Sequence, residues 1–286
     1  MGDFLNLISS PETRLRWEGD TTSDLQPRLS ISENITWRNQ VLNIAITNDD
    51  GLTEGALILL RVAKRHAKNA YAILPNKQRS AVSAALTLHK PIRIIEHQKD
   101  VYTINGNPAD CSIFAIHSKK FPKPDLILSG VNWGDNAGLS PLISSGTIGA
   151  CWKAALYGVP AIAFSLYREK SDRLGWVKAE NWKSELLEKK IEEVFLFLKP
   201  KIESGKFFVV NLPSIQYLEN AKIVHPKTLQ PVRFSVKIDE RLDPYDHPYY
   251  WIGGEEREPI AGSDLYEIAV NHNITVKEIS ISSLGR

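Results

Sequence analysis

Two adjacent aspartates, Asp49 and Asp50, stand at the end of an apolar run in the segment IAITNDDGLTEG (44–55). Neighbouring carboxylates repel one another, so the pair is unfavourable unless a positive charge lies between them. A bound divalent cation would supply that charge. The alternative is that Asn-Asp-Asp-Gly serves as turn and helix-capping chemistry, for which these residue types are favoured. The pair alone does not decide between the two interpretations.

The other residues that could take part in chemistry offer oxygen rather than nitrogen or sulfur. Hydroxyl groups occur in RSAVSAALTLHKP (79–91), and amide oxygens occur at Asn132 and Asn136. Carboxylate, hydroxyl and amide oxygens are the ligands that hard cations such as Mg²⁺ and Mn²⁺ prefer. The seven histidines show no HExxH or similarly close spacing, so the sequence gives no support to a zinc-hydrolase helix.

The segment SSGTIGA (144–150) opens an apolar stretch that continues as CWKAALYG. Small residues with free backbone N–H groups at the start of a helix bind anions well, and phosphate above all. By itself this motif is weak, because Ser-Gly-Thr is also a common way to begin a helix. A hard-cation site and a phosphate site at one edge of a sheet together indicate metal-assisted phosphoryl transfer to water.

The elements that must position these residues alternate between about 41 and 166. Apolar runs without clean alternation, separated by helical patterns, predict an α/β fold with a mostly parallel sheet covered on both faces. Strands are expected at 41–47, 69–75, 90–97, 101–106, 124–130 and 160–166, and helices at 54–68, 108–120 and 148–158. Ligands bind beyond the carboxyl ends of the strands in such sheets. The acidic pair and GVNWGDN (130–136) fall there.

The rest of the chain has a different pattern. An amphipathic helix is expected at 179–199, a strand at 207–214, and a short helix followed by a strand over 262–281. The segment RFSVKIDERLDPYDHPYYWIGG (233–254) predicts two strands joined by a turn rich in proline and aspartate. We expect a loose N-terminal extension at 1–40 and one α/β domain at 41–282. Its core spans 41–215, and a hairpin and C-terminal arm span 216–286.

Composition restricts the class of protein. A hydrophobic share of 43% and a charged share of 24% are ordinary for a globular protein, and the net charge of +2 gives no strong attraction to nucleic acid or membrane. No apolar run approaches the roughly 18 residues that a membrane span needs, and no signal-peptide pattern opens the chain. Two cysteines predict free thiols in a reducing compartment. We therefore expect a cytoplasmic protein with no nucleic-acid or membrane partner.

The chain resembles the SurE family of metal-dependent nucleotidases. The stretches that carry the resemblance follow one another in family order: TNDDG (47–51), LPNKQRSAVSAALTLHKP (74–91), INGNPADC (104–111), PDLILSGVNWGDNAG (124–138), SSGTIGACWKAALYGVPAIAFS (144–165), VVNLPS (209–214), DPYDHPYYWIGG (243–254) and GSDLYEI (262–268). Together these motifs are highly specific. The resemblance implies a Rossmann-like sheet flanked by helices, with a C-terminal hairpin and an exchange arm.

The resemblance also implies a site. One divalent cation per subunit, Mg²⁺ or Mn²⁺, is expected on four ligands: Asp49, Asp50, Ser80 and Asn132. One of the two aspartates would take the proton from the attacking water. The phosphate pocket is expected at Asn136, Ser145, Gly146 and Thr147. The family hydrolyses nucleoside 5′- and 3′-monophosphates and forms homodimers or homotetramers. Asp110, in the G-x-P-x-D segment, is expected to cap its helix.

Three departures from the family pattern concern substrate preference and assembly rather than the reaction. Ala81 follows Ser80 where the family usually has glycine, Trp133 is unusually large for its position, and the extension at 1–40 is atypical.

Two other classes of protein share part of the pattern. A receiver domain also has an acidic pair after its first strand, but here PDLIL ends in Ser129 and Gly130 where a receiver has its phosphoacceptor aspartate. That strand also lies about 80 residues past the pair, too far for a receiver. A nucleotide-binding module that senses without catalysis stays open. A phosphate-release assay separates it from an enzyme.

Overall fold

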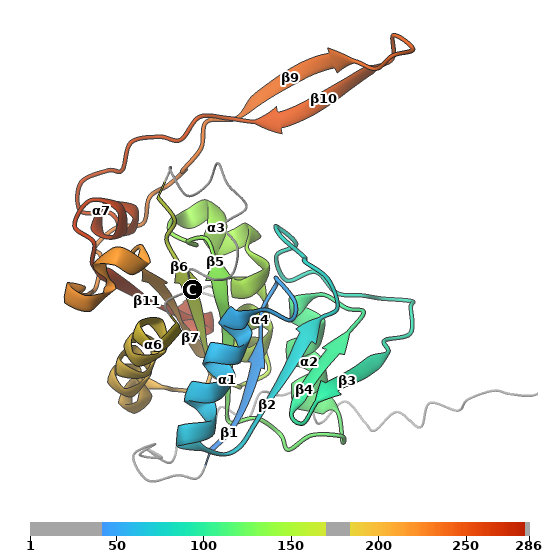
Figure 1. The fold of residues 1–286 in the computed structure, drawn as a ribbon, viewed down its shortest axis with the longest axis vertical. Helices are drawn as coiled ribbons and strands as arrows, with labels where there is room; N and C mark the ends of the chain where they lie inside the picture. The colour runs from blue at the N-terminus through green and yellow to red at the C-terminus, as the bar shows by residue number, and fades with distance from the viewer. Residues whose placement is uncertain (1–41, 170–183, 284–286) are drawn as a thin grey trace, which may run out of the picture. The chain divides into compact units, whose positions relative to one another are not determined.

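The structure is a computed structural model that describes residues 42–169 and 184–283 (Figure 1). The predicted loose extension at 1–40 lies outside the described residues. None of the described helices is long and apolar enough to cross a membrane.

The described residues build a nine-stranded sheet with the strand order β3-β4-β2-β1-β5-β6-β7-β11-β8 (Figure 1). Its strands are β1 (Leu42–Thr47), β2 (Ala67–Pro75), β3 (Ile94–Gln98), β4 (Val101–Ile104), β5 (Leu126–Trp133), β6 (Ala161–Leu166), β7 (Lys206–Leu212), β8 (Ile223–Val224) and β11 (Ile274–Ser280). Neighbours are parallel except β3 with β4 and β11 with β7. The predicted mostly parallel sheet is confirmed.

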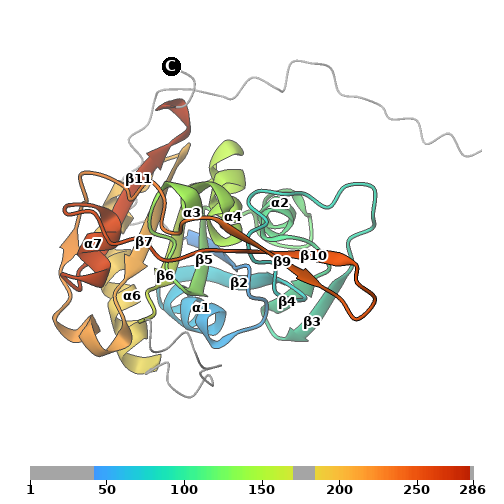
Figure 2. The same cartoon turned by 90° about the horizontal axis from the view of Figure 1, so that it is seen from above.

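Helices cover both faces of the sheet. Figure 2 shows α1 (Glu54–His66) and α6 (Ser184–Leu198) on one side, and α2 (Pro108–His117) and α4 (Gly146–Leu156) on the other. Successive strand side chains point to opposite faces, so Ile44 and Ile46 join the first layer's core while Ala45 joins the second. Because both faces are buried, β1 is mostly apolar, apart from Asn43 near its start and Thr47 at its end, and shows no polar alternation.

The centre of the sheet contains a topological switch point. The chain runs from β1 to its parallel neighbour β2 on one side, and later returns to β1's other side as β5. Connections that diverge from one strand leave a crevice beyond its carboxyl end, where α/β proteins bind ligands. The acidic pair follows β1 directly, at this crevice.

A separate two-stranded sheet forms the hairpin, which we define as β9 (Lys237–Leu242) and β10 (Pro248–Gly253). The two strands pair only with each other among the described elements (Figure 1). Asp243 closes the turn, because its carboxylate accepts the backbone N–H groups of Tyr245 and His247 at 2.8 and 2.9 Å. The predicted pair of strands with a turn rich in proline and aspartate is confirmed.

Several boundaries differ from the sequence prediction. β3 begins at Ile94 rather than at 90, because the preceding residues form a loop without regular structure. β5 extends to Trp133, and a short helix α3 (Leu139–Ser144) was not expected. Among the residues that the structure describes, the remaining helical segments are α7 (Asp264–Ala269) and three 3₁₀ turns: η2 (Lys199–Lys201), η3 (Ile215–Asn220) and η4 (Ile281–Ser283). Both cysteines are buried free thiols, as predicted.

Candidate active site

The acidic pair lies just past the end of β1, with Asp49 buried and Asp50 partly buried. The turn that follows is made by other residues. The Asn48 side chain donates to the Gly51 carbonyl at 2.7 Å and accepts the Gly51 N–H at 3.0 Å. Gly51 has a φ of +83°, which glycine adopts without strain. Asn48 and Gly51 therefore supply the turn chemistry, and the two aspartates are not needed for it.

Asp49 touches the start of α4. The hydroxyl of Thr147 donates to Asp49 Oδ1 at 2.5 Å. A Cβ atom on Gly146 would lie 2.9 Å from Asp49 Cβ and 3.1 Å from Oδ2, so only glycine permits this approach. The SSGTIGA segment (144–150) and the acidic pair, singled out separately from distant parts of the sequence, are thus in direct contact.

Asp50 faces the end of β5. Its Oδ1 accepts a hydrogen bond from Gln78 Nε2 at 3.2 Å, and its Oδ2 lies 3.5 Å from the backbone nitrogen of Trp133. Both partners are neutral. Within residues 42–169 and 184–283, neither Asp49 nor Asp50 forms an ion pair. The negative charge of the pair is therefore not neutralised by the described part of the chain.

The electrostatics of the pair follow from this arrangement. Burial, and then the neighbouring Asp50 charge, raise the pKa of Asp49 to about 6, although the Thr147 hydrogen bond works in the opposite direction. Burial also raises the pKa of Asp50, against the smaller influence of its two hydrogen-bond donors. Both shifts mean that the site disfavours two bare negative charges.

The loop that carries Ser80 is held against this site from both sides. The Arg79 N–H donates to the Asp49 carbonyl at 2.7 Å, and the Ser83 N–H donates to the Ser144 carbonyl at 2.9 Å. Ser80 lies between these anchors and is exposed. Ala81 has a φ of +56°, a left-handed conformation that costs a residue with a Cβ more than it costs glycine.

Two asparagines follow along and beyond β5. The Asn132 amide nitrogen donates to the Gly134 carbonyl at 2.6 Å, which leaves its oxygen available to a ligand. Asn136 is buried: its N–H donates to Asn211 Oδ1 at 2.7 Å, and its amide nitrogen donates to Ser165 Oγ at 2.8 Å. Asn136 therefore rests on the carboxyl ends of β6 and β7.

The start of α4 uses its side chains internally. Ser145 is the N-cap, and its hydroxyl accepts the Ile148 N–H at 3.3 Å. Thr147 commits its hydroxyl to Asp49 and its carbonyl to Ser129 Oγ, which donates at 2.8 Å. Of the backbone N–H groups in the first turn, that of Ile148 bonds Ser145 and that of Thr147 acts on the Asp49 carboxylate, which leaves the N–H of Gly146 for an anion.

Asp110 caps its helix, as the sequence predicted. Its carboxylate accepts the N–H of Asn107 at 2.7 Å in a capping box at the start of α2. It also accepts the N–H of Thr87 at 3.0 Å, and so holds the far end of the Ser80 loop.

The described residues include no group of three or more histidine, cysteine, aspartate or glutamate side chains that could hold a metal ion. The structure instead places two carboxylates without a cationic partner just after β1. The loop that carries Ser80 is hydrogen-bonded to the backbone of Asp49, and the end of β5 lies next to Asp50. Such an oxygen set fits a hard cation such as Mg²⁺ or Mn²⁺.

Sequence reasoning missed three contacts of the site. It placed Thr147 in the phosphate pocket, which stays a prediction, but did not foresee that the Thr147 hydroxyl binds Asp49. It overlooked Gln78 as a partner of Asp50 and Arg168, whose guanidinium lies 5.4 Å from the centre of the Trp133 ring. The available signal for Gln78 was its place in the NKQRS segment beside Ser80.

Comparison with known proteins gives consistent matches. A family model described as Survival protein SurE matches residues 44–233. The "5'-nucleotidase SurE" of Methanosphaera stadtmanae is 35% identical over 253 residues, covering 84% of this chain and 95% of that protein. The protein of the same name from Thermofilum pendens is 33% identical, covering 85% of this chain and 92% of that protein. The crystal structure of the SurE protein from Aquifex aeolicus superposes with a TM-score of 0.68 at 25% identity. The superposition covers 84% of this chain and 93% of that protein.

The raised pKa of Asp49 predicts how stability depends on pH in the metal-free protein. A carboxyl with an ordinary pKa of 3.8 in the unfolded chain and about 6 in the fold stabilises the fold fully below pH 4. This contribution is lost as the pH rises through about 6. Asp49→Asn removes the titration and keeps an acceptor for Thr147. The mutant should therefore lose less stability than the wild type between pH 4 and 7, by on the order of 3 kcal/mol.

The measurement is urea unfolding in EDTA across this pH range. Glu240→Gln, which alters an exposed carboxylate of the hairpin, serves as the control and should follow the wild type. Parallel profiles for Asp49→Asn and the wild type would contradict the prediction.

Proposed function

The chain belongs to the SurE family of 5′-nucleotidases, and we propose that it is a metal-dependent phosphomonoesterase acting on nucleoside 5′-monophosphates, with 3′-monophosphates as further substrates. The products are nucleoside and inorganic phosphate. The observation that supports this most is the contact of a buried acidic pair, without a neutralising partner among the described residues, with the first turn of α4. One cation and one phosphate group would satisfy both halves of that arrangement.

The cation would be held by Asp49, Asp50, Ser80 and Asn132. When bound, it supplies positive charge that stabilises the phosphoryl group in the transition state and lowers the pKa of water. One aspartate, partly free of the metal, accepts the proton of the attacking water. The connection between Asp49 and Thr147 keeps that carboxylate beside the phosphate position.

The phosphate group would lie against the first turn of α4. The backbone N–H group of Gly146 would bind its oxygens and stabilise the charge that develops on them, while Asn136 would hold the phosphate group in the ground state and the transition state alike. Gly146 has no side chain to block this position. Its close approach to Asp49 would place the bound phosphate near the cation.

The alternative is a module that binds nucleotides without cleaving them. Its acidic pair would hold a cation and its α4 start a phosphate, but it would release no product. Incubation with a panel of nucleoside monophosphates, with Mg²⁺ and with Mn²⁺, should release phosphate. Binding without release would favour the sensing module.

A test of the cation site uses EDTA and one substitution. EDTA should abolish activity, and Mg²⁺ or Mn²⁺ should restore it. Asp50→Asn should lower kcat by about two orders of magnitude or more, because the cation stabilises the transition state more than the ground state. In EDTA its melting temperature should equal or exceed that of the wild type, since the substitution removes like-charge repulsion with Asp49.

The same pair of measurements separates a purely architectural role. If Asp50 served only turn and capping chemistry, Asp50→Asn would leave kcat nearly unchanged. Retained activity with a lowered melting temperature would therefore contradict the metal mechanism.

Trp133 is proposed to border the nucleoside. Its ring is half-buried beside Asn132 and lies near the Arg168 guanidinium. An aromatic face offered to a purine contributes on the order of 1 kcal/mol, or about five-fold in KM. Trp133→Ala should raise KM for purine nucleoside monophosphates and change KM for p-nitrophenyl phosphate much less. Equal changes for both substrates would assign the ring a purely structural role.

Assembly into a homodimer or homotetramer is proposed from the hairpin. Its apolar side chains are strongly exposed, with Tyr245 and Ile252 each at 80% and Ile238 at 63%. A two-stranded element is marginally stable alone, and such a surface is typical of a protein contact. A second copy of the chain that receives the arm by exchange would cover it.

Light scattering at micromolar concentration should report two or four times the 32.1 kDa of the chain. Ile238 and Ile252 are cross-strand partners, so Ile238→Ser with Ile252→Ser should weaken the assembly, whereas Glu240→Gln should not. A wild-type mass near 32.1 kDa would contradict the proposal.

The compartment is proposed to be the cytoplasm. The buried free thiols Cys111 and Cys151 support a reducing environment.

A further inference from the structure

One buried guanidinium joins the site to the base of the hairpin. Arg233 is 6% exposed and forms an ion pair through Nη1 with Asp135. Its Nε and Nη2 donate to Glu256 Oε1 at 3.1 and 2.9 Å. The side chains of Asp135 and Glu256 are themselves largely buried. Breaking one side of such a cluster leaves a buried charge without its partner, which is strongly unfavourable.

The three charges come from two distant parts of the chain. Asp135 precedes Asn136 in the segment 134–138, which we call the site loop. Arg233 and Glu256 belong to the hairpin base, residues 233–235 and 255–257. The two strands of this base are joined by hydrogen bonds from the Ser235 N–H to the Glu255 carbonyl at 2.9 Å and from the Arg257 N–H to the Arg233 carbonyl at 2.7 Å.

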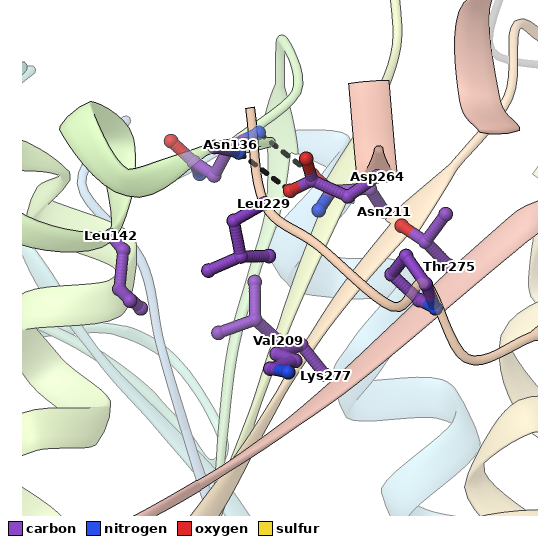
Figure 3. A pocket seen from close by; sticks show the side chains of 10 residues that line it. Asn136, Leu142, Val209, Asn211, Leu229, Asp264, Thr275 and Lys277 are labelled. Carbon is purple, nitrogen blue, oxygen red and sulfur yellow. Dashed lines mark hydrogen bonds between the residues drawn. The ribbon is translucent and has the colours of Figure 1, made fainter. Parts of the chain in front are cut away.

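A second connection holds the other end of the site loop. Asp264 accepts the N–H of Gly138 at 2.6 Å through Oδ2 and the N–H of Gln230 at 2.8 Å through Oδ1. The Leu139 N–H donates to the Gln230 carbonyl at 2.9 Å. Figure 3 shows Asp264 beside Asn136 and Asn211, at the small pocket that these residues line. The site loop is thus fastened on both sides of Asn136 to the segment that leads into and out of the hairpin.

We propose that Arg233 is a positioning residue that fixes Asn136 for phosphate binding and couples the hairpin base to the active site. This inference rests on the proposed function for its kinetic part only. Asn136 itself is anchored at the carboxyl ends of β6 and β7, and its loop is held by the Arg233–Asp135 pair on one side and by the bond from Gly138 to Asp264 on the other. Loss of the ion pair releases the Asp135 side of the loop, so the asparagine samples positions that no longer suit a phosphate oxygen.

The cation site should respond differently. Asn132 lies within β5 and pairs with Ser165 of β6, so strand pairing holds it independently of the ion pair. The coupling therefore acts on phosphate binding and not on cation binding. A raised KM with an unchanged Mn²⁺ activation constant distinguishes positioning of Asn136 from a general loss of structure.

The variants are Arg233→Met, Asp135→Asn and Arg233→Lys. Lys237→Met is the matched control, because it removes a positive charge from an exposed residue of the hairpin outside the hairpin base. Two quantities are measured on the full chain: hydrogen exchange of the amides in 136–139, and KM, kcat and the Mn²⁺ activation constant with a nucleoside monophosphate.

Arg233→Met and Asp135→Asn should each speed exchange at 136–139 and raise KM at least ten-fold. Their kcat should change less, because Asn136 binds phosphate in the ground state and the transition state alike. The Mn²⁺ activation constant should stay within three-fold. Arg233→Lys should raise KM less than Arg233→Met does, because its ammonium keeps the positive charge. It should not reach the KM of the wild type, because an ammonium cannot bind two carboxylates as the guanidinium does. The double variant that combines Arg233→Met with Asp135→Asn should have a KM no higher than that of the poorer single variant, as expected for residues that act together.

The outcomes separate the two proposals. A wild type that releases no phosphate would overturn the proposed function, and the exchange rates would still decide whether Arg233 orders the site loop. An active wild type with Arg233→Met and Asp135→Asn indistinguishable from Lys237→Met in exchange and KM would overturn the coupling. If Arg233→Met does not fold, Asp135→Asn carries the test, because it preserves the size of the side chain.

Discussion

The burial of two adjacent carboxylates at the end of the central strand is the constraint around which the site is organised. Asp49 is 5% exposed, and the structure offers it the Thr147 hydroxyl and two backbone N–H groups against the competing charge of Asp50. Taking a carboxylate from water into a protein is unfavourable without hydrogen bonds or opposite charge. The elements near the pair approach it closely: Gly146 lets α4 reach Asp49, and the Arg79 N–H fixes the Ser80 loop to its carbonyl.

The fold permits this arrangement because the sheet is parallel at its centre. Parallel strands end at the same edge, so the acidic pair after β1 meets the end of β5, where Asp50 approaches the Trp133 nitrogen, although the two are about 80 residues apart in sequence. The apolar strands are covered by helices on both faces and provide a rigid base. A few bonds then hold the loops that carry Ser80 and Asn136. The Ser80 loop is bonded to Asp49 and Ser144, and the loop of Asn136 is bonded to Asn211 and Arg233.

Much of this could be predicted from the sequence. Apolar runs and turn residues located β1, β2, β5, β6, α1 and the hairpin, because each is a local pattern. The helix α3 was missed since it is short and has no sustained apolar period. The link between Thr147 and Asp49, and that between Arg233 and Asp135, each join residues 98 positions apart. No local pattern encodes such a pairing, because it depends on how the completed sheet brings its edges together.

A comparison of the buried carboxylates within this chain shows why the acidic pair points to a ligand. Asp110 accepts backbone N–H groups from Asn107 and Thr87, and Asp264 accepts three, from Gly138, Gln230 and Leu265. Asp135 has the guanidinium of Arg233. In each case the fold itself supplies donors or a charge that stabilise the ionised form.

Asp49 and Asp50 differ in standing next to each other without a cationic partner among the described residues. Asp49 has the hydroxyl and backbone N–H of Thr147 and its own N–H, and Asp50 has the amide of Gln78 and a backbone N–H at 3.5 Å. Burial raises the pKa of Asp264 as well, but in the acidic pair a carboxylate adjacent in sequence, that of Asp50, raises the pKa of Asp49 further. The described residues give the other buried carboxylates donors or a guanidinium of their own, but they leave the two adjacent charges of this pair without a positive partner, just past the carboxyl end of β1. The proposed cation would give this pair the positive charge that Arg233 gives to Asp135 and Glu256 at the hairpin base.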